Sequence, residues 1–298
     1  MIQHFSQIEA LMEDRTPRSV AVAMAEEEDV LKAIAMAADH NIAEPILVGS
    51  ERSIREIAEK AGLDVSSYTL HDTQGEEECA QLAVDLVNRG EAECLMKGKV
   101  PTATIMKTVM KRQGGLRSNK ALSHITLVDF PFLDKLTIAT DCALNIEPDM
   151  STKISILENA AEFAKKLGVE TPKAAVVAAV EKINPTMQIT SEAAVLAKMS
   201  ERGQFKDFYV DGPFALDNAF SIKSRWIKGI HSEFPDIADI ILFPDIEAGN
   251  TFYKTIGFLT DYDMAGIIVG AQVPIILTSR SDKDRIKFLS ILTGIALT

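Results

Sequence analysis

The stretch Val273-Pro274-Ile275-Ile276-Leu277-Thr278-Ser279-Arg280-Ser281-Asp282 is apolar in its first half and abruptly polar in its second half. A pattern rich in Ile and Leu follows and predicts a helix from about residue 283 to 297. In open α/β sheets, ligands bind beyond the carboxyl ends of the strands. Ser279, Arg280 and Asp282 are therefore candidate ligand-binding residues. The alternative is that Ser281 or Asp282 only caps the helix.

Apolar β-rich runs alternate with amphipathic runs along the chain, which is the pattern of βαβ units and a mainly parallel sheet. The fold class is therefore α/β. The expected strands cover residues 20–24, 45–48, 94–96, 124–128, 136–140, 174–179, 208–210, 239–243, 266–269 and 274–277. The expected helices cover residues 29–40, 53–61, 76–89, 102–111, 151–167, 191–201, 250–259 and about 283–297.

The composition is that of an ordinary globular protein, with 298 residues, 47% of them hydrophobic and 25% charged. The longest weakly polar run, Ala265 to Leu277, contains Gln272 and is too short to cross a bilayer. The N-terminus lacks the pattern of a signal peptide, so we expect a cytoplasmic protein. The three cysteines show neither disulfide nor metal-ligand spacing, so no metal site is expected.

The net charge of −12 argues against nucleic acid or an anionic membrane as a partner. One region departs from this balance, because no acidic residue occurs between Glu93 and Asp129. The basic residues in it are Lys97, Lys99, Lys107, Lys111, Arg112, Arg117 and Lys120. A positive patch without carboxylates suits a small polyanionic ligand, with Lys97, Lys99 and Arg117 as candidates. A solvated helix face is the alternative reading of Lys107, Lys111 and Arg112.

Three other expected strands lead into turns that carry charged or amide side chains. They supply Asn145, Asp211, Asp245 and Asn250 as further candidate binding residues, with turn chemistry as the alternative for all four and a helix cap as a further alternative for Asn145 and Asn250. Several loops of this kind favour a ligand cleft at the strand ends. The chain has no G-x-G-x-x-G after a strand, no P-loop and no G-x-S-x-G. A Rossmann dehydrogenase, a P-loop kinase and a serine hydrolase therefore lose support.

Four segments together resemble the phosphate acetyl/butyryltransferase family in order and spacing. They are Asp141-Cys142-Ala143-Leu144-Asn145 with Pro148, Asp211-Gly212-Pro213-Phe214-Ala215-Leu216-Asp217-Asn218-Ala219, Pro244-Asp245-Ile246-Glu247-Ala248-Gly249-Asn250, and Gly270-Ala271 through Ser279-Arg280-Ser281-Asp282. The likeness extends from Lys97-Gly98 to the last helix. The chain is most similar to the phosphate butyryltransferase branch, because Gly-Pro-Phe-Ala-Leu-Asp stands where the acetyl branch usually has Glu-Leu-Gln-Phe-Asp-Ala.

The resemblance implies two three-layer α/β/α domains with mainly parallel sheets, as in isocitrate and isopropylmalate dehydrogenases, and an active site in the interdomain cleft. Residues 1–130 with 282–298 would form the first domain and residues 131–281 the second. It also implies the reversible reaction of an acyl-CoA, here butyryl-CoA, with phosphate to give acyl phosphate and CoA by direct attack in a ternary complex. No tightly bound cofactor is implied, since coenzyme A is a substrate or product. A homo-oligomer, at least a dimer, is expected.

The same resemblance suggests roles for the residues. Arg280 would bind phosphate, and the Ser279 hydroxyl would reach the thioester oxygen. Lys97, Lys99 and Arg117 would meet phosphates of substrate or CoA, and Asn145 and Asn250 would bind phosphate or acyl oxygen. The acetyl branch places its general base where this chain has Ile286, so that role does not carry over. Asp282 ranks slightly ahead of the other candidate bases, which are Asp284, Asp211, Asp245 and Glu247.

Other functions stay open on the sequence alone. They are a phosphate acetyltransferase, a phosphate acyltransferase that uses acyl carrier protein, a metal- and NAD-dependent dehydrogenase of the same fold, and a sensor that binds CoA or phosphate without turnover. Only kinetics separates an enzyme from such a sensor, because both need the same basic cleft.

Overall fold

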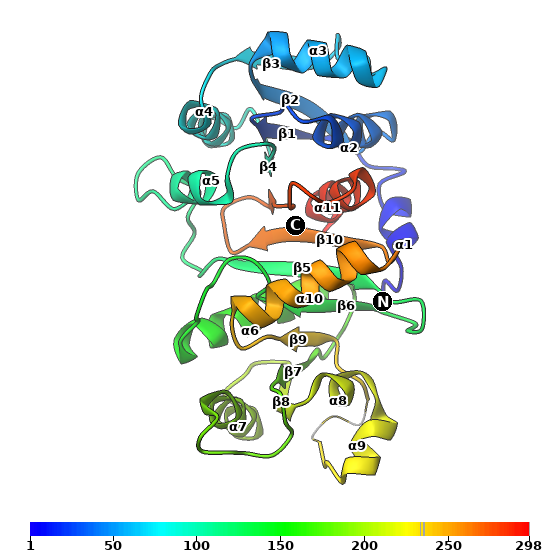
Figure 1. The fold of residues 1–298 in the computed structure, drawn as a ribbon, viewed down its shortest axis with the longest axis vertical. Coiled ribbons are helices and arrows are strands. Elements are labelled where there is room, and N and C mark those ends of the chain that lie inside the picture. The colour runs from blue at the N-terminus through cyan, green and yellow to red at the C-terminus, as the bar shows by residue number, and fades with distance from the viewer. Residues whose placement is uncertain (233, 235, 298) are drawn as a thin grey trace. The chain divides into compact units, whose positions relative to one another are not determined.

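The structure is a computed structural model that describes residues 1–232, 234 and 236–297 (Figure 1). The chain forms two compact units. By place in the sequence, not in space, we call His4–Lys120 with Asp263–Thr298 the outer unit, and Met1–Gln3 with Ala121–Tyr262 the central unit. The domain limits expected from the sequence stay a prediction, because compact units are not necessarily domains that fold independently. The compact units differ from them in grouping residues 263–281 with the N-terminal stretch, and residues 1–3 and 121–130 with the central stretch.

The sheet of the outer unit has the strand order β3-β2-β1-β4-β11-β10. Neighbouring strands are parallel except β10 and β11, which are antiparallel. The strands are β1 (Arg18–Ala23), β2 (Ala43–Gly49), β3 (Thr69–Asp72), β4 (Cys94–Lys97), β10 (Met264–Val269) and β11 (Ile275–Ile276). The carboxyl ends of β1, β4 and β11 therefore lie side by side.

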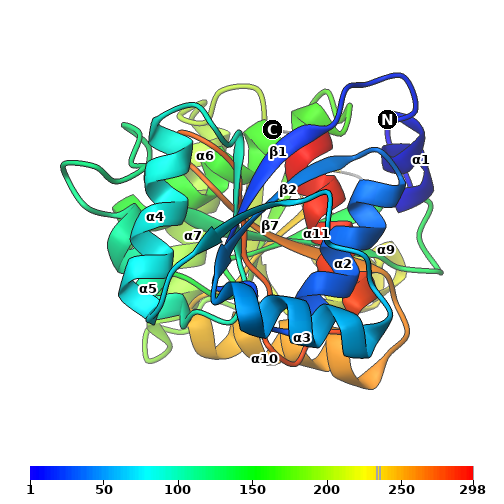
Figure 2. The same ribbon diagram turned by 90° about the horizontal axis from the view of Figure 1, so that it is seen from above.

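Helices cover both faces of this sheet. In Figure 2, α4 and α5 lie on one side of β1 and β2, and α2 and α11 lie on the other. The helices of the unit are α1 (Phe5–Ala10), α2 (Glu28–Asp39), α3 (Glu51–Ala61), α4 (Glu76–Asn88), α5 (Thr102–Val109) and α11 (Asp284–Ala296). α11 is buried on every side from Ile286 to Ala296, because it packs against α2 and the strands β10 and β11.

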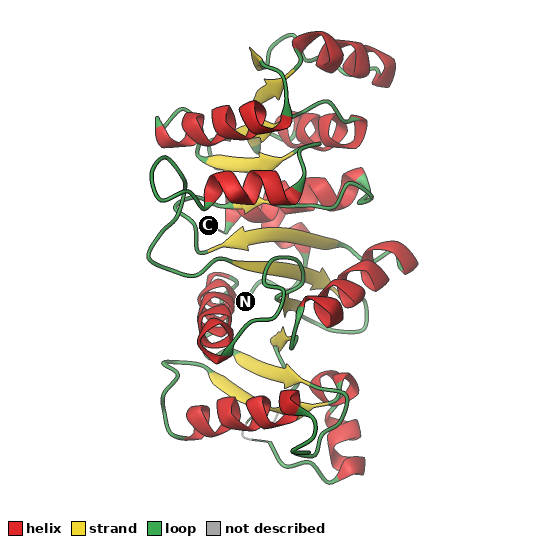
Figure 3. Ribbon diagram, turned by 60° about the vertical axis from the view of Figure 1, so that its left-hand side comes forward, coloured by secondary structure: helices red, strands yellow, loops and turns green. Residues whose placement is uncertain are grey.

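The central unit has the strand order β5-β6-β9-β7-β8, in which only the β5–β6 pair is antiparallel. Figure 3 shows strands lying between helices in this unit as well. Its strands are β5 (Ser123–Asp129), β6 (Leu136–Thr140), β7 (Lys173–Val177), β8 (Tyr209–Phe214) and β9 (Ile240–Leu242). Its helices are α6 (Met150–Lys166), α7 (Gln188–Glu201), α8 (Leu216–Phe220), α9 (Ile222–Lys228) and α10 (Ile246–Leu259).

The predicted α/β class with a mainly parallel sheet is confirmed, and each expected strand and helix has a counterpart. The sequence missed the edge strand β3 and the short helices α1, α8 and α9. The predicted start of a helix at residue 250 was wrong, since α10 begins at Ile246 with Asp245 as its N-cap. Across the described residues, no helix has the length and apolar character needed to span a membrane.

Candidate active site

The turn after β4 is fitted closely to the end of β1. The amide of Gly98 donates to the carbonyl of Ala23 (2.9 Å), and the amide of Lys99 donates to that of Met24 (2.7 Å). A Cβ on Gly98 would collide with the Met24 carbonyl oxygen, so this close approach of two backbones requires glycine. The approach fixes Lys97 at the carboxyl edge of the sheet.

Lys97 is buried there, with only 3% of its surface exposed. Its Nζ donates to the carbonyl of Gly98 (3.1 Å) and to that of Thr278 (3.4 Å), which follows β11. Burial lowers the pKa of Lys97 to about 8. The carboxylates of Glu27 and Asp282 act to raise this pKa, whereas the cations of Arg280 and Lys287 act to lower it. Lys97 therefore changes charge within the range of pH in which enzymes work.

Residues 279 to 282 form a closed turn between β11 and α11. The amide of Ser279 donates to Oδ2 of Asp282 (2.6 Å), and the amide of Asp282 donates back to the Ser279 carbonyl (3.1 Å). The N-cap residue of α11 is Lys283, whose own side chain makes no capping hydrogen bond, so neither Ser281 nor Asp282 occupies the N-cap position. The Asp282 carboxylate instead shapes the turn.

The side chains of this turn differ in exposure. Asp282 is buried, Ser279 is half-buried and Arg280 is exposed. The hydroxyls of Ser279 and Ser281 lie 3.2 Å apart and share a hydrogen bond. The turn thus carries the exposed Arg280 guanidinium and the half-buried Ser279 hydroxyl next to the Asp282 carboxylate, which accepts a hydrogen bond from the Ser279 amide.

The basic stretch divides into two parts. Lys107 on α5 pairs with Glu77 (3.6 Å), and Lys111, just after α5, donates to Gln81 (2.5 Å). These contacts favour the alternative interpretation, in which both lysines are surface residues. Lys99 and Arg117 are exposed. The backbone of Arg117 pairs with that of Ala271 in an isolated bridge.

In the central unit, Asp141 organises the turn after β6. It is 2% exposed, and its carboxylate accepts hydrogen bonds from the amides of His124 (3.0 Å), Ala143 (2.9 Å) and Leu144 (2.8 Å). Its Oδ2 also accepts from Nδ2 of Asn145 (2.6 Å). Because the carboxylate is used in this way, Asp141 holds Asn145 in a fixed place at the strand end.

α10 starts against the same turn. Asp245 accepts from the amide of Ala248 (2.9 Å) and is the N-cap of α10, whereas the sequence pattern placed it in a turn. A Cβ on Gly249 would collide with the Asp141 carbonyl oxygen, which explains the glycine. Asn250 lies inside α10 and donates to the Cys142 carbonyl (3.2 Å), so its cap interpretation is wrong. Asn145, Asp245 and Asn250 thus share one edge of this sheet.

Asp211 lies within β8, and the prediction that it follows the strand was wrong. The strand continues through Pro213 because β8 is an edge strand, where a missing amide donor is tolerated. Oδ1 of Asp211 accepts from the amide of Gly212 (2.8 Å). Burial lowers the pKa of the Arg225 guanidinium, and the negative charge of Asp211 acts to raise it.

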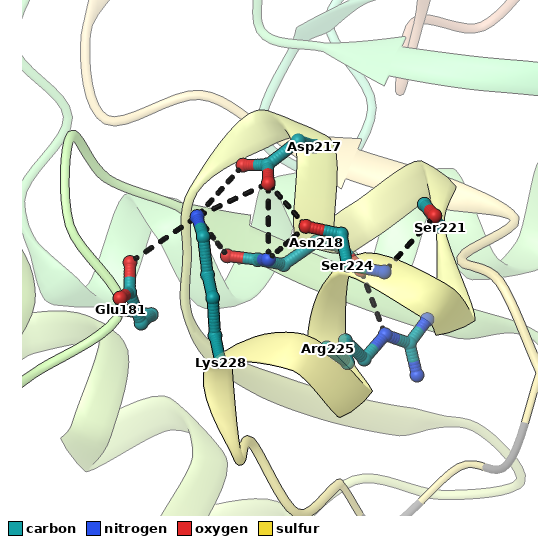
Figure 4. Close-up of polar contacts among 7 residues, drawn as sticks. All are labelled: Glu181, Asp217, Asn218, Ser221, Ser224, Arg225 and Lys228. Atoms are coloured by element: carbon teal, nitrogen blue, oxygen red, sulfur yellow. Dashed lines mark hydrogen bonds and ion pairs between the residues drawn. The ribbon is translucent and has the colours of Figure 1, made fainter.

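Arg225 belongs to a polar cluster between α8 and α9 that sequence reasoning missed (Figure 4). Nζ of Lys228 lies 3.0 Å from Asp217 and 3.6 Å from Glu181, and Nε of Arg225 donates to the Asn218 carbonyl (2.7 Å). These contacts join the two short helices to the loop after β7. The sequence signal was the Ser221-x-x-Ser224 spacing, in which Ser221 caps α9 by accepting from the Ser224 amide.

A second group that the sequence did not single out is the ion pair of Glu27 and Lys287 behind the 279–282 turn. The only sequence signal was a lysine within the apolar run of the last helix.

Comparisons with known proteins identify the family of this chain. The model of the family described as "Phosphate acetyl/butaryl transferase" matches residues 5–85 and 77–294. A phosphate butyryltransferase of Clostridium acetobutylicum is 42% identical over 291 residues, which are 98% of this chain and 97% of that protein. A phosphate acetyltransferase of Thermotoga maritima is 40% identical over 274 residues, 92% of this chain and 93% of that protein.

Among solved structures, a branched-chain phosphotransacylase from Enterococcus faecalis V583 superposes with a TM-score of 0.83 at 31% identity. The match covers 94% of this chain and 98% of that chain. The family resemblance read from the motifs is therefore confirmed. This chain belongs to the phosphate acetyl/butaryl transferase family.

Proposed function

We propose that this protein is a phosphate butyryltransferase, which converts butyryl-CoA and inorganic phosphate into butyryl phosphate and CoA. The observation that carries the proposal is the closed Ser279–Asp282 turn beside the buried Lys97, at the adjoining ends of β4 and β11. The full-length similarity to the butyryltransferase of Clostridium acetobutylicum supports the choice of substrate.

Arg280 and Ser279 suit the two parts of the reacting pair. The exposed planar guanidinium of Arg280 can bind two oxygens of the phosphate dianion at once. The hydroxyl of Ser279 can donate to the thioester oxygen, which gains negative charge as phosphate attacks the carbonyl carbon. Since both side chains project from one hydrogen-bonded turn, the turn holds phosphate and thioester in a fixed relation and removes the entropic cost of their encounter.

The attack forms a bond from a phosphate oxygen to the carbonyl carbon and breaks the carbon–sulfur bond. CoA leaves as a thiolate, which takes up a proton. In the reverse direction the carboxylate of Asp282, held by the Ser279 amide, receives the proton of the CoA thiol. We retain direct attack, because Cys142 is fully buried and burial raises the pKa of its thiol above the ordinary value.

The remaining candidate residues either bind the substrates or hold the backbone near the residues that bind them. Lys97, Lys99 and Arg117 supply positive charge for the phosphates of substrate or CoA. Asn145 and Asn250 supply amide groups for phosphate or acyl oxygen. Asp211 and Asp245 act through the backbone that they hold, since each accepts a hydrogen bond from a main-chain amide.

Thiol release from butyryl-CoA and acetyl-CoA, each with and without phosphate, tests this assignment. We expect release that depends on phosphate and is faster with butyryl-CoA. Faster release from acetyl-CoA would instead favour a phosphate acetyltransferase, which is the name of the 40% identical relative from Thermotoga maritima. Release only from acylated carrier protein would favour a phosphate acyltransferase that uses acyl carrier protein.

The proposal keeps the cytoplasmic location and the lack of a tightly bound cofactor that the sequence suggested. It also keeps the homo-oligomer. Trp226, Ile227 and Ile222 on α9 are 80%, 66% and 51% exposed, and apolar side chains of this size gathered on one helix favour a protein contact. The molar mass in solution, measured by light scattering, tests it; a monomer at micromolar concentration would refute the oligomer.

A further inference from the structure

Lys287 is a buried charged side chain in α11, whereas Asp284 and Arg285 in the first turn of this helix are half-buried and exposed. It is 1% exposed, and its neighbours along α11, among them Phe288 and Leu289, belong to the core. Its Nζ lies 3.4 Å from Oε1 of Glu27, the N-cap residue of α2. A buried ion pair is expensive to desolvate, and apolar residues of the same size often serve stability as well or better. Stability alone therefore does not account for this pair.

The hydrogen bonds of Lys287 show what else it does. Nζ donates to the carbonyl of Asp282 (2.5 Å) and to that of Arg280 (3.5 Å). Both carbonyls belong to the turn that carries Ser279. Within this turn, the Asp282 carboxylate accepts a hydrogen bond from the Ser279 amide. Lys287 on α11 holds the same turn by donating to its carbonyls.

We propose that Lys287 and Glu27 are positioning residues, which fix the Ser279–Asp282 turn. The proposal rests on the proposed function, because it assigns the pair to the same site. Lys287 holds Arg280 and Asp282 through their backbone carbonyls, and Glu27 holds the ammonium of Lys287 in place.

The field at Lys97 gives the pair a signature that a purely structural role lacks. The charged groups that act on Lys97 are the carboxylates of Glu27 and Asp282 and the cations of Arg280 and Lys287. Glu27 raises the pKa of Lys97 and Lys287 lowers it. Removal of one charge of the pair should therefore move the titration of Lys97 in one direction, and removal of the other charge should move it in the opposite direction.

The experiment compares Lys287→Met, Glu27→Gln and the double variant with wild type. Lys32→Met is the matched control, because Lys32 pairs with Glu28 at 2.6 Å on the solvent side of α2. The ammonium of Lys97 is titrated by NMR with ¹³C-labelled lysine, and its signal is assigned from its loss in Lys97→Arg. Hydrogen exchange of the amides of residues 279–282 is measured on the same samples, and thermal unfolding verifies that each variant is folded.

In Lys287→Met, we expect the midpoint of the Lys97 titration to rise, the amides of the turn to exchange faster, and kcat/KM to fall on the order of tenfold to a hundredfold through misplacement of the reacting groups. In Glu27→Gln the midpoint should fall, and in the double variant the two shifts should largely cancel. Lys287→Arg, which keeps the charge, should leave the midpoint near that of wild type. Lys32→Met should match wild type in all three measurements.

The proposal is overturned if folded Lys287→Met and Glu27→Gln shift the Lys97 titration in the same direction, or if neither the titration nor exchange in the turn changes. If Lys287→Met does not fold, Glu27→Gln decides: a midpoint of the Lys97 titration that rises or stays at the wild-type value overturns the proposal. Titration and exchange need no substrate. A wild-type protein that shows the expected shifts but no turnover of any acyl-CoA would sink the proposed function and leave the positioning of the turn established.

Discussion

At the scale of the residue, the site depends on charges whose surroundings differ sharply. Arg280 is exposed, as its proposed role in phosphate binding requires, whereas Lys97 is buried and donates to backbone carbonyls. Burial opposes the charged form of Lys97, so this lysine titrates well below an ordinary lysine. The charge of Lys97 therefore depends on pH within the range in which enzymes work.

The buried lysine predicts a pH dependence. The pKa of Lys97 is lowered to about 8, so Lys97 is a cation below that pH and neutral above it. Since the cation is the form that attracts phosphate, kcat/KM should fall as pH rises through about 8. In Lys97→Met this descending limb should be absent and activity should be low throughout. A wild-type profile that is retained in Lys97→Met would contradict the assignment, and Lys107→Met serves as the surface control.

The exposed arginine predicts a loss specific to phosphate. Arg280→Lys keeps the charge but loses the planar fork of donors, so the KM for phosphate should rise by about tenfold to a hundredfold. The KM for butyryl-CoA should change much less. Steady-state kinetics with each substrate varied in turn measures both constants, with Arg52→Lys on the exposed face of α3 as the control. Equal effects on both substrates would argue against a phosphate ligand.

At the scale of the element, strand ends position the site, and close backbone contacts position the strand ends. Gly98 and Gly249 each meet a carbonyl of a neighbouring strand or turn at a distance that excludes a Cβ. The sequence showed both glycines as turn residues, but it could not show the partner carbonyls. The same limit explains Asp245, which the pattern placed in a turn and the structure places at an N-cap.

Gly249→Ala should therefore destabilise the central unit. Alanine normally favours a helix over glycine by about 1 kcal/mol. The collision with the Asp141 carbonyl should reverse this and cost about 1–3 kcal/mol. Urea unfolding followed by circular dichroism measures the change, with Thr251→Ala in α10 as the control. A stability equal to or above that of wild type would show that the turn after β6 yields easily.

At the scale of the whole molecule, the order of apolar runs predicted the α/β class, and the strand-end motifs predicted the family. The sequence missed elements with a weak pattern: β3 lies at the sheet edge with no buried residue, and α8 and α9 are short helices held by polar contacts. It also missed the pair of Glu27 and Lys287, because these residues come from opposite ends of the chain and only the packing of α11 on α2 brings them together.

The most direct test of the central claim is to follow ³¹P NMR of the protein with butyryl-CoA and inorganic phosphate while free thiol is measured on the same sample. The account predicts an acyl phosphate signal that grows in step with thiol release and disappears when phosphate is omitted. Thiol release without acyl phosphate, or neither product, would contradict it.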